Sequence, residues 1–139
     1  SLLNQHLHFS QLQIEDDFIR RYMNYLGHNE FGLNHKPWND PINYQDRSKI
    51  YYWLEQWFLF YKDIYNNYQS YTNCYFVIYE ELVNPNSVIK ILKKINLEKN
   101  KKIDLQILRN SNKKELNIEY DKNIFDKSQL LYQNFLSSN

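Results

Sequence analysis

The stretch from residue 46 to residue 68 constrains the fold of this chain most strongly, because its apolar side chains recur at helical spacing. They fall three or four residues apart, at Ile50, Trp53, Leu54, Trp57, Phe58, Tyr61, Ile64 and Tyr65. Such a stripe predicts an amphipathic helix that buries one face against other elements. We expect Asp46 to cap this helix and the helix to end near Tyr68. Its tryptophans and tyrosines are expected to pack in a core rather than to stack on a cofactor.

A short, continuously apolar segment follows at residues 74–79, with the sequence Cys74-Tyr75-Phe76-Val77-Ile78-Tyr79. A run of aromatic and β-branched residues is typical of a strand that is buried on both faces, as in a parallel sheet covered by helices. Asn84-Pro85 then favours a helix start, because proline suits the first helical position. The apolar stripe of that helix comprises Val88, Ile89, Leu92 and Ile95. The predicted fold class is α/β, mostly helical, with at least one buried strand of the parallel type at residues 74–79.

Helical spacing also marks both ends of the chain. The first stripe comprises Leu2, Leu3, His6 and Phe9, and the last comprises Phe125, Leu130, Leu131, Phe135 and Leu136. Between them, Asp16 and Asp17 supply first-turn negative charge for a helix that Gly27 closes. The pattern of residues 98–124 predicts no definite element. Because no linker or repeat interrupts the chain, we expect residues 1–139 to form a single domain.

Composition excludes several classes of function. The formal net charge is +1 and the pI is near 7.8, so no overall field would attract nucleic acid or an anionic membrane. The apolar runs at residues 57–61 and 74–79 are far shorter than the roughly 20 residues of a membrane span. A single cysteine, Cys74, excludes an internal disulfide. A cytoplasmic protein is expected. The chain has nineteen Asn, thirteen Tyr and no Ala, so periodicity is a better guide than residue propensity.

Periodicity disappears in the long segment of residues 28–44, where Gly32, Pro37 and Pro41 punctuate a run rich in His, Asn and Trp. Long loops within compact domains are often functional, so this one is a candidate acceptor-side lid. Its candidate substrate-binding residues are His28, Glu30, Phe31, His35 and Trp38. A purely structural loop is the alternative. The histidines and Glu30 have ligand-type side chains, but their spacing matches no strong zinc signature and no metal is predicted.

Several segments are similar to the sulfotransferase superfamily. Tyr79-Glu80-Glu81-Leu82 followed by Asn84-Pro85 resembles the motif that ends a late strand of that family and leads into a helix. Ser1-Leu2-Leu3, with Gln5-His6 and Phe9, resembles the helix that follows the family's 3′-phosphate-binding strand end. Residues 25–32 are similar to segments of bacterial members, and Asn96 stands where the family often has glycine.

The resemblance implies the C-terminal portion of a P-loop-like, doubly wound fold. The family's cofactor is 3′-phosphoadenosine 5′-phosphosulfate, whose sulfuryl group is transferred to a hydroxyl or amine of a small-molecule or glycan acceptor. A phosphosulfate needs a glycine-bearing loop at a helix N-terminus, and neither Gly27 nor Gly32 has that context. We therefore expect the N-terminal P-loop half to be absent and this fragment to be inactive alone. The alternative is a non-enzymatic helical interaction module with residual sulfotransferase likeness.

The resemblance also implies site residues. Ser1 would donate a hydrogen bond to the 3′-phosphate, and the basic cluster Arg109, Lys113 and Lys114 would close over it; a frayed terminus and solvated charges are the alternatives. His6 and His8 are weak candidates for a general base, and their spacing places them on different helical faces. Glu80 and Glu81 are expected to be structural. Removing half of a sheet would leave an exposed edge, so self-association through that edge is expected.

Overall fold

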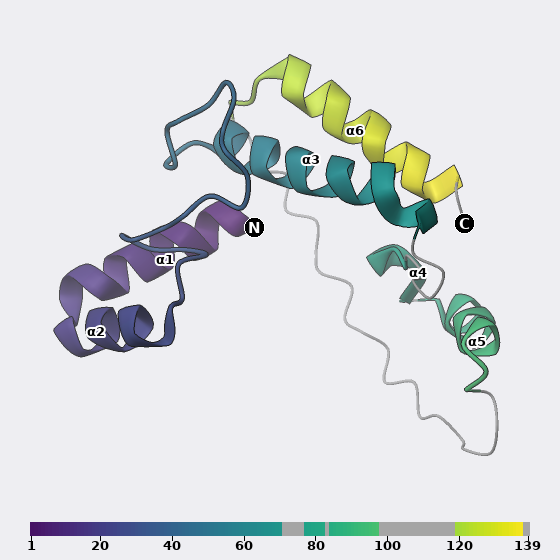
Figure 1. The fold of residues 1–139 in the computed structure, drawn as a ribbon, viewed down its shortest axis with the longest axis horizontal. Coiled ribbons are helices and arrows are strands. Elements are labelled where there is room, and N and C mark those ends of the chain that lie inside the picture. The colour runs from purple at the N-terminus through teal and green to yellow at the C-terminus, as the bar shows by residue number, and fades with distance from the viewer. Residues whose placement is uncertain (71–76, 83, 98–118, 138–139) are drawn as a thin grey trace.

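The computed structural model describes residues 1–70, 77–82, 84–97 and 119–137, and in these ranges every regular element is helical. The elements are α1 (Leu2–Glu15), α2 (Asp17–Leu26), α3 (Ile50–Asn67), a 3₁₀ turn (Tyr68–Ser70), α4 (Tyr79–Leu82), α5 (Pro85–Lys94) and α6 (Lys122–Ser137). Figure 1 shows α1 and α2 folded as a hairpin at one end, α4 and α5 at the other, and α3 and α6 between them. No helix within the described ranges is long and apolar enough to cross a bilayer.

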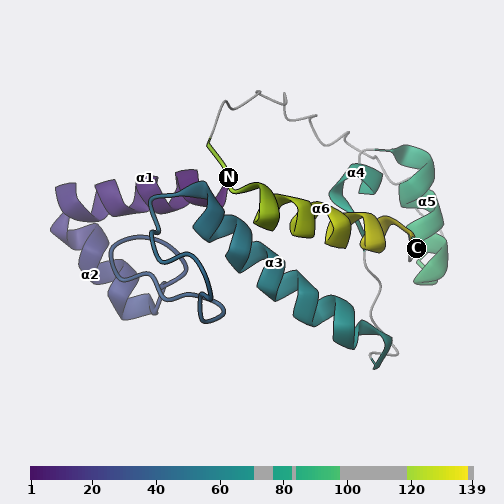
Figure 2. The same ribbon diagram turned by 90° about the horizontal axis from the view of Figure 1, so that it is seen from above.

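Helices α3 and α6 form the central pair of the fold. They lie side by side and run in the same direction in both views (Figures 1 and 2). The buried side chains of α6 recur at helical spacing, at Ile124, Ser128, Leu131 and Phe135. The ring of Phe135 lies 6.1 Å from that of Tyr61 and 5.1 Å from that of Tyr65, so aromatic contacts join the two helices. This packing leaves Tyr61 and Tyr65 of the predicted stripe half-buried, whereas the buried residues of α3 are Tyr52, Trp53, Glu55 and Gln56.

The predicted C-terminal helix is confirmed, but its buried face is only partly the predicted one. Leu131 and Phe135 are buried, whereas Phe125, Leu130 and Leu136 are 39%, 64% and 42% exposed. Ser128 takes a buried position because its hydroxyl donates to the carbonyl oxygen of Ile124 within the helix, at 2.8 Å. A serine whose hydroxyl is satisfied locally can occupy an apolar face at little cost. Hydrophobicity alone therefore misplaced the stripe.

The hairpin of α1 and α2 turns on Asp16. Its carboxylate accepts hydrogen bonds from the backbone N–H groups of Phe18 and Ile19 at 2.8 and 3.3 Å, which caps α2. Its own N–H donates to the carbonyl oxygen of Leu12, which ends α1. Gly27 then closes α2 in the left-handed conformation, with φ of 70°, as its sequence position predicted.

The α/β assignment is wrong for the described part of the chain, because no residue there lies in a strand. Val77 and Ile78 of the predicted strand are irregular, Tyr79 begins α4, and Cys74–Phe76 lie outside the described residues. Val77 is 36% and Tyr79 is 50% exposed, which a strand buried on both faces would not allow. Periodicity cannot separate a buried strand from other apolar segments, and a strand needs neighbours for its backbone groups.

The predicted start of α3 is also wrong by three residues, because its N-cap is Lys49 and not Asp46. Asp46 caps the preceding turn instead, where its carboxylate accepts from the backbone N–H and the hydroxyl of Ser48 at 3.0 and 2.7 Å. Lys49 occupies the N-cap of α3 without a side-chain hydrogen bond.

By contrast, the predicted start of α5 is confirmed, because the side chain of Asn84 caps the helix by accepting a hydrogen bond from the N–H of Asn86. Asn96 adopts φ of 57°, the left-handed conformation that favours glycine.

The central pair yields a stability prediction from two neighbouring leucines of α6. Leu131 is 6% exposed and Leu130 is 64% exposed. Leu131→Ala should therefore lower the free energy of unfolding by about 2–5 kcal/mol through lost burial and a residual cavity. Leu130→Ala should change it by less than about 0.5 kcal/mol. Urea titration followed by circular dichroism measures both, and equal losses would contradict the packing of α6 on α3.

Candidate functional site

The loop of residues 27–49 is held against α1 and α3 by buried polar side chains. Figure 1 shows it passing from the α1–α2 hairpin to the start of α3. Glu55 of α3 is 1% exposed, and its carboxylate faces three consecutive loop amides. It accepts from the backbone N–H groups of Ile42, Asn43 and Tyr44 at 3.1–3.3 Å and from Nδ2 of Asn43 at 2.8 Å. Successive N–H groups of this kind form an anion nest, here filled by the protein's own side chain.

Two glutamines fix other parts of the same loop. Gln56, which is 0% exposed, accepts from the N–H groups of Trp38 and Asn39 through Oε1 and donates through Nε2 to the carbonyl oxygen of Asn39. Gln13 of α1 accepts from the N–H of Leu33 at 2.7 Å. Gly32 has φ of 88°, and a Cβ there would meet Oε1 of Gln13 at 2.2 Å. The loop therefore requires glycine at residue 32 for both conformation and space.

The buried rings of His6, His35 and Trp53 pack together as a cluster, in which the two histidine rings lie 5.5 Å apart. The ring of Trp53 is 5.0 Å from that of His6 and 4.8 Å from that of His35. Nδ1 of His6 accepts from the N–H of Gly32 at 3.2 Å. His35 donates through Nδ1 to the carbonyl oxygen of Asn29 and has Nε2 2.7 Å from the hydroxyl of Tyr52. These partners suit neutral rings with the hydrogen on Nε2 of His6 and on Nδ1 of His35.

Burial accounts for most of the electrostatic behaviour of this histidine pair. Desolvation lowers the pKa of His6, and the nearby His35 and Arg47 lower it further. Desolvation also lowers the pKa of His35, with Arg47 adding to the effect and backbone hydrogen bonds opposing it. Both rings therefore stay neutral near pH 7, and Tyr52, whose pKa is raised by burial, keeps its proton.

The predicted substrate-binding residues of the loop fall into two groups, since Phe31, His35 and Trp38 are linked by ring contacts around Trp53 and His28 and Glu30 form a separate exposed pair. His35 is buried with both ring nitrogens engaged, so in this structure it supports the loop. His28 and Glu30 are more than half exposed and lie 3.6 Å apart, as an exposed pair. Phe31 and Trp38 contact each other with ring centroids 6.5 Å apart, and Trp38 also contacts Phe60 of α3 at 6.0 Å. Trp38 is 39% exposed and Phe31 is half-buried, so Trp38 is the exposed aromatic residue among the five.

The remaining predicted residues fall into three groups. Ser1 caps α1, and its Oγ accepts from the N–H of Asn4 at 3.3 Å. His8 is exposed while His6 is buried, in agreement with their two-residue spacing. Arg109, Lys113 and Lys114 lie outside the described residues. Within the described ranges, no three His, Cys, Asp or Glu side chains are placed to share a metal ion.

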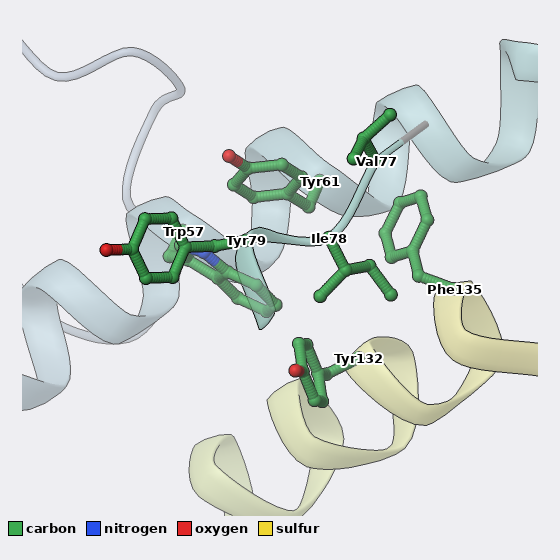
Figure 3. A pocket seen from close by; sticks show the side chains of 7 residues that line it. All are labelled: Trp57, Tyr61, Val77, Ile78, Tyr79, Tyr132 and Phe135. Carbon is green, nitrogen blue, oxygen red and sulfur yellow. The ribbon is translucent and has the colours of Figure 1, made fainter. Parts of the chain in front are cut away.

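An aromatic pocket of about 240 Å³ lies between α3, α6 and residues 77–79. Its lining residues, shown in Figure 3, are Trp57, Tyr61, Val77, Ile78, Tyr79, Tyr132 and Phe135. The ring of Trp57 lies 4.8 Å from that of Tyr61, which in turn contacts Phe135 across the helix pair. Apolar pockets with a few polar groups are the usual form of small-molecule sites, so this pocket is the candidate binding site of the chain.

The sequence predicted neither the residues that hold the loop nor a binding role for any of the seven residues that line the pocket. Glu55 and Gln56 were visible as polar residues inside the most apolar helix, which is a signal that buried partners must exist nearby. Trp57 and Tyr61 were assigned to core packing alone. Tyr132 belonged to no predicted stripe, because its neighbours Leu131 and Phe135 defined the pattern.

The nest around Glu55 yields a second stability prediction. Glu55→Gln preserves shape but replaces one acceptor oxygen by an NH₂ group that faces loop amides. The free energy of unfolding should fall by roughly 2–3 kcal/mol, because charged hydrogen bonds are lost and buried donors remain. The exposed Glu15→Gln is the matched control and should stay within about 0.5 kcal/mol of the parent in urea unfolding. Equal midpoints for the two variants would show that the loop does not depend on the nest.

The histidine pair predicts a pH dependence of stability. Since the folded-state pKa of each ring lies below the ordinary value of 6.5, the unfolded chain binds more protons in acid. The resulting stability is fully present above pH 6.5 and is lost as the pH falls from 6.5 toward the folded-state pKa values.

The variant His6→Asn tests this dependence, because asparagine keeps an acceptor near the position of Nδ1 but cannot titrate. Urea midpoints at pH 8 and pH 5.5 should differ less for His6→Asn than for the parent, and His8→Asn should leave the difference unchanged. A parent midpoint that is constant over this range would contradict the prediction.

Comparison with known proteins assigns no relative to this chain. No family model, no curated protein and no solved structure matches it significantly. The geometry of its own residues therefore has to carry the functional argument.

Proposed function

We propose that these residues form the acceptor-binding helical portion of a cytoplasmic protein that transfers a sulfuryl group from 3′-phosphoadenosine 5′-phosphosulfate to a hydroxyl or amine. In this proposal the donor is held by polypeptide outside the 139 residues. Gly27 ends α2, and the N–H of Gly32 is donated to His6, so neither glycine offers its backbone to a phosphate. The chain contributes the acceptor side of the reaction.

One observation carries the proposal: the Tyr79 motif, which is one of the segments behind the sulfotransferase resemblance, meets the aromatic helix that precedes it at the aromatic pocket. Tyr79 begins the Tyr-Glu-Glu-Leu motif, and Trp57 lies on the aromatic helix that precedes it. Both side chains line the same pocket, although twenty-one intervening residues separate them in the chain. A motif that only stabilised the fold would not need to open onto a pocket, so the shared position supports a role in binding.

The pocket suits an acceptor with a flat apolar body. Its four aromatic rings besides Tyr79 provide faces and edges for a ring system, and a volume near 240 Å³ fits one or two fused rings. The phenol groups of Tyr61 and Tyr132 bring polar atoms to an otherwise apolar lining. Such a lining would bind the body of the acceptor and leave its hydroxyl or amine to face the donor.

The loop connects to this pocket through a row of aromatic contacts. Trp38 contacts Phe60, whose ring lies 5.3 Å from Tyr61, a residue that lines the pocket. Trp38 is itself placed by the buried Gln56, which accepts from its backbone N–H at 3.0 Å. The loop thus has the fixed geometry expected of a segment that covers an acceptor site.

A helical interaction module is the second candidate, and α2 favours it. Phe18, Tyr22 and Tyr25 are 73%, 53% and 88% exposed on one side of that helix. The rings of Phe18 and Tyr22 stack on each other at 5.9 Å. An exposed aromatic face of this kind is typical of a surface that contacts another protein or domain. The described ranges hold no sheet edge that would support the expected self-association, so α2 is the surface on which association would depend.

The decisive experiment uses the complete open reading frame that encodes these residues. With labelled 3′-phosphoadenosine 5′-phosphosulfate and 2-naphthol as acceptor, we expect transfer of the label to naphthol. Ile78→Trp fills the pocket and should raise KM for naphthol by roughly tenfold or more. Leu130→Trp, at an exposed position of α6, is the matched control and should not change KM.

Two results would separate the candidates. Failure of transfer to naphthol and to amine acceptors, with no binding of adenosine 3′,5′-bisphosphate, would refute the enzyme and favour the module. Size-exclusion chromatography with light scattering on the same protein and on Tyr25→Ser then tests whether α2 mediates association.

A further inference from the structure

A second hollow, of about 400 Å³, lies where α3 and α6 begin. Its lining residues are Tyr44, Tyr51, Glu119, Tyr120 and Asp121. They come from the end of the loop, the first turn of α3 and the residues that lead into α6. None of them belongs to the aromatic pocket of Figure 3, which is lined by later residues of both helices.

The walls of this hollow are mainly phenol rings. The rings of Tyr44 and Tyr51 lie 4.9 Å apart, inclined at 45°, and the ring of Tyr120 lies 4.8 Å from that of Phe125. The backbone of Tyr44 is held in place, because its N–H donates a hydrogen bond to the carboxylate of Glu55. Burial and a hydrogen bond to Asp121 raise the pKa of Tyr44 to about 12, so its hydroxyl stays protonated and acts as the donor.

The charge of the hollow is negative. Asp121 is held ionised, because the hydrogen bonds from Tyr44 and from the N–H groups of Asn123 and Ile124 lower its pKa. Glu119 adds a second carboxylate, and the lining includes no Lys or Arg. The positive charge of Lys127 has the smallest effect among the causes that lower the pKa of Asp121, so the hydrogen bonds matter more than this cation. Three tyrosines and two carboxylates thus line one open space.

We propose that this hollow binds an organic cation of the size of a trimethylammonium group. Aromatic faces attract a cation through their quadrupoles, and they do so best for a weakly hydrated cation with methyl groups that can contact the rings. A calcium ion would need six to eight oxygen ligands, and here the oxygens of Asp121 already serve Tyr44 and the start of α6. The inference stands independently of sulfuryl transfer.

Choline and its uncharged isostere 3,3-dimethylbutan-1-ol provide the test on the intact chain. Titration at low salt, followed by the NMR shifts of the tyrosine rings, should show choline binding roughly fivefold or more tightly than the alcohol. Raising the salt should weaken choline binding, because the carboxylates are partly exposed. Equal binding of the two compounds, or displacement of choline by Ca²⁺ at equal concentration, would overturn the proposal.

Matched variants locate the site. Tyr51→Leu and Glu119→Gln should each weaken choline binding severalfold, and Glu119→Gln avoids any effect on the cap of α6. Tyr25→Leu and Glu15→Gln, on the distant α1–α2 hairpin, should leave it unchanged. Circular dichroism shows whether Tyr51→Leu still folds, and Glu119→Gln decides the outcome if it does not. Choline affinity that is the same in parent and Glu119→Gln would refute the assignment.

Discussion

The carboxylate of Glu55 places a negative charge inside the protein at the point where three consecutive loop amides converge. A buried carboxylate is costly unless hydrogen bonds replace its water, and here four donors do so. The same contact fixes the path of residues 42–44. Because Gln56 is the next residue of α3, it anchors Trp38 and Asn39 in the same way. One turn of one helix therefore determines the conformation of a loop that has no regular structure of its own.

This anchoring gives α3 two different faces. On the loop side, the polar side chains of α3 are hydrogen-bonded to loop amides. On the same side, Tyr52 and Trp53 contact the buried histidines of the loop and α1. Its other side is aromatic and packs on α6. Each end of the α3–α6 pair opens onto a hollow, one aromatic and apolar, the other aromatic and acidic. The chemistry of the two hollows differs because only the one at the helix starts includes carboxylates.

The functional proposal rests on how distant segments meet. The sulfotransferase resemblance was carried by short motifs, and the α/β fold that it implied is not the fold of the described residues. The convergence of Tyr79 and Trp57 on one pocket is a separate, geometric argument for ligand binding. It supports an acceptor site, whereas the identity of the donor rests on the resemblance and on the proposed transfer assay.

The sequence by itself predicted α1, α2, α3, α5 and α6, because each is encoded by spacing and by local capping, whereas Tyr79 at the start of α4 was assigned to a strand. The stripe of residues 50–65 predicted α3, Gly27 predicted the end of α2, and Asn84-Pro85 predicted the start of α5. These features depend on neighbours within a few residues, so they can be predicted without a tertiary structure. The loop was also predicted from the loss of periodicity, while the substrate-binding role of Phe31 and Trp38 stays a prediction.

Only the tertiary structure decided the conformation of the apolar segment before α5 and the burial of polar residues on α3 and α6. The apolar residues 77–79 would suit a buried strand as well as they suit the irregular segment and helix start that line the pocket, and long-range packing makes the choice. Glu55, Gln56 and Ser128 occupy buried positions that hydrophobicity would give to apolar residues, because partners distant in sequence, or one turn back in the helix, satisfy their polar atoms. Local spacing fixes which residues share a helix face, but the face that becomes buried depends on the elements that come to lie against it.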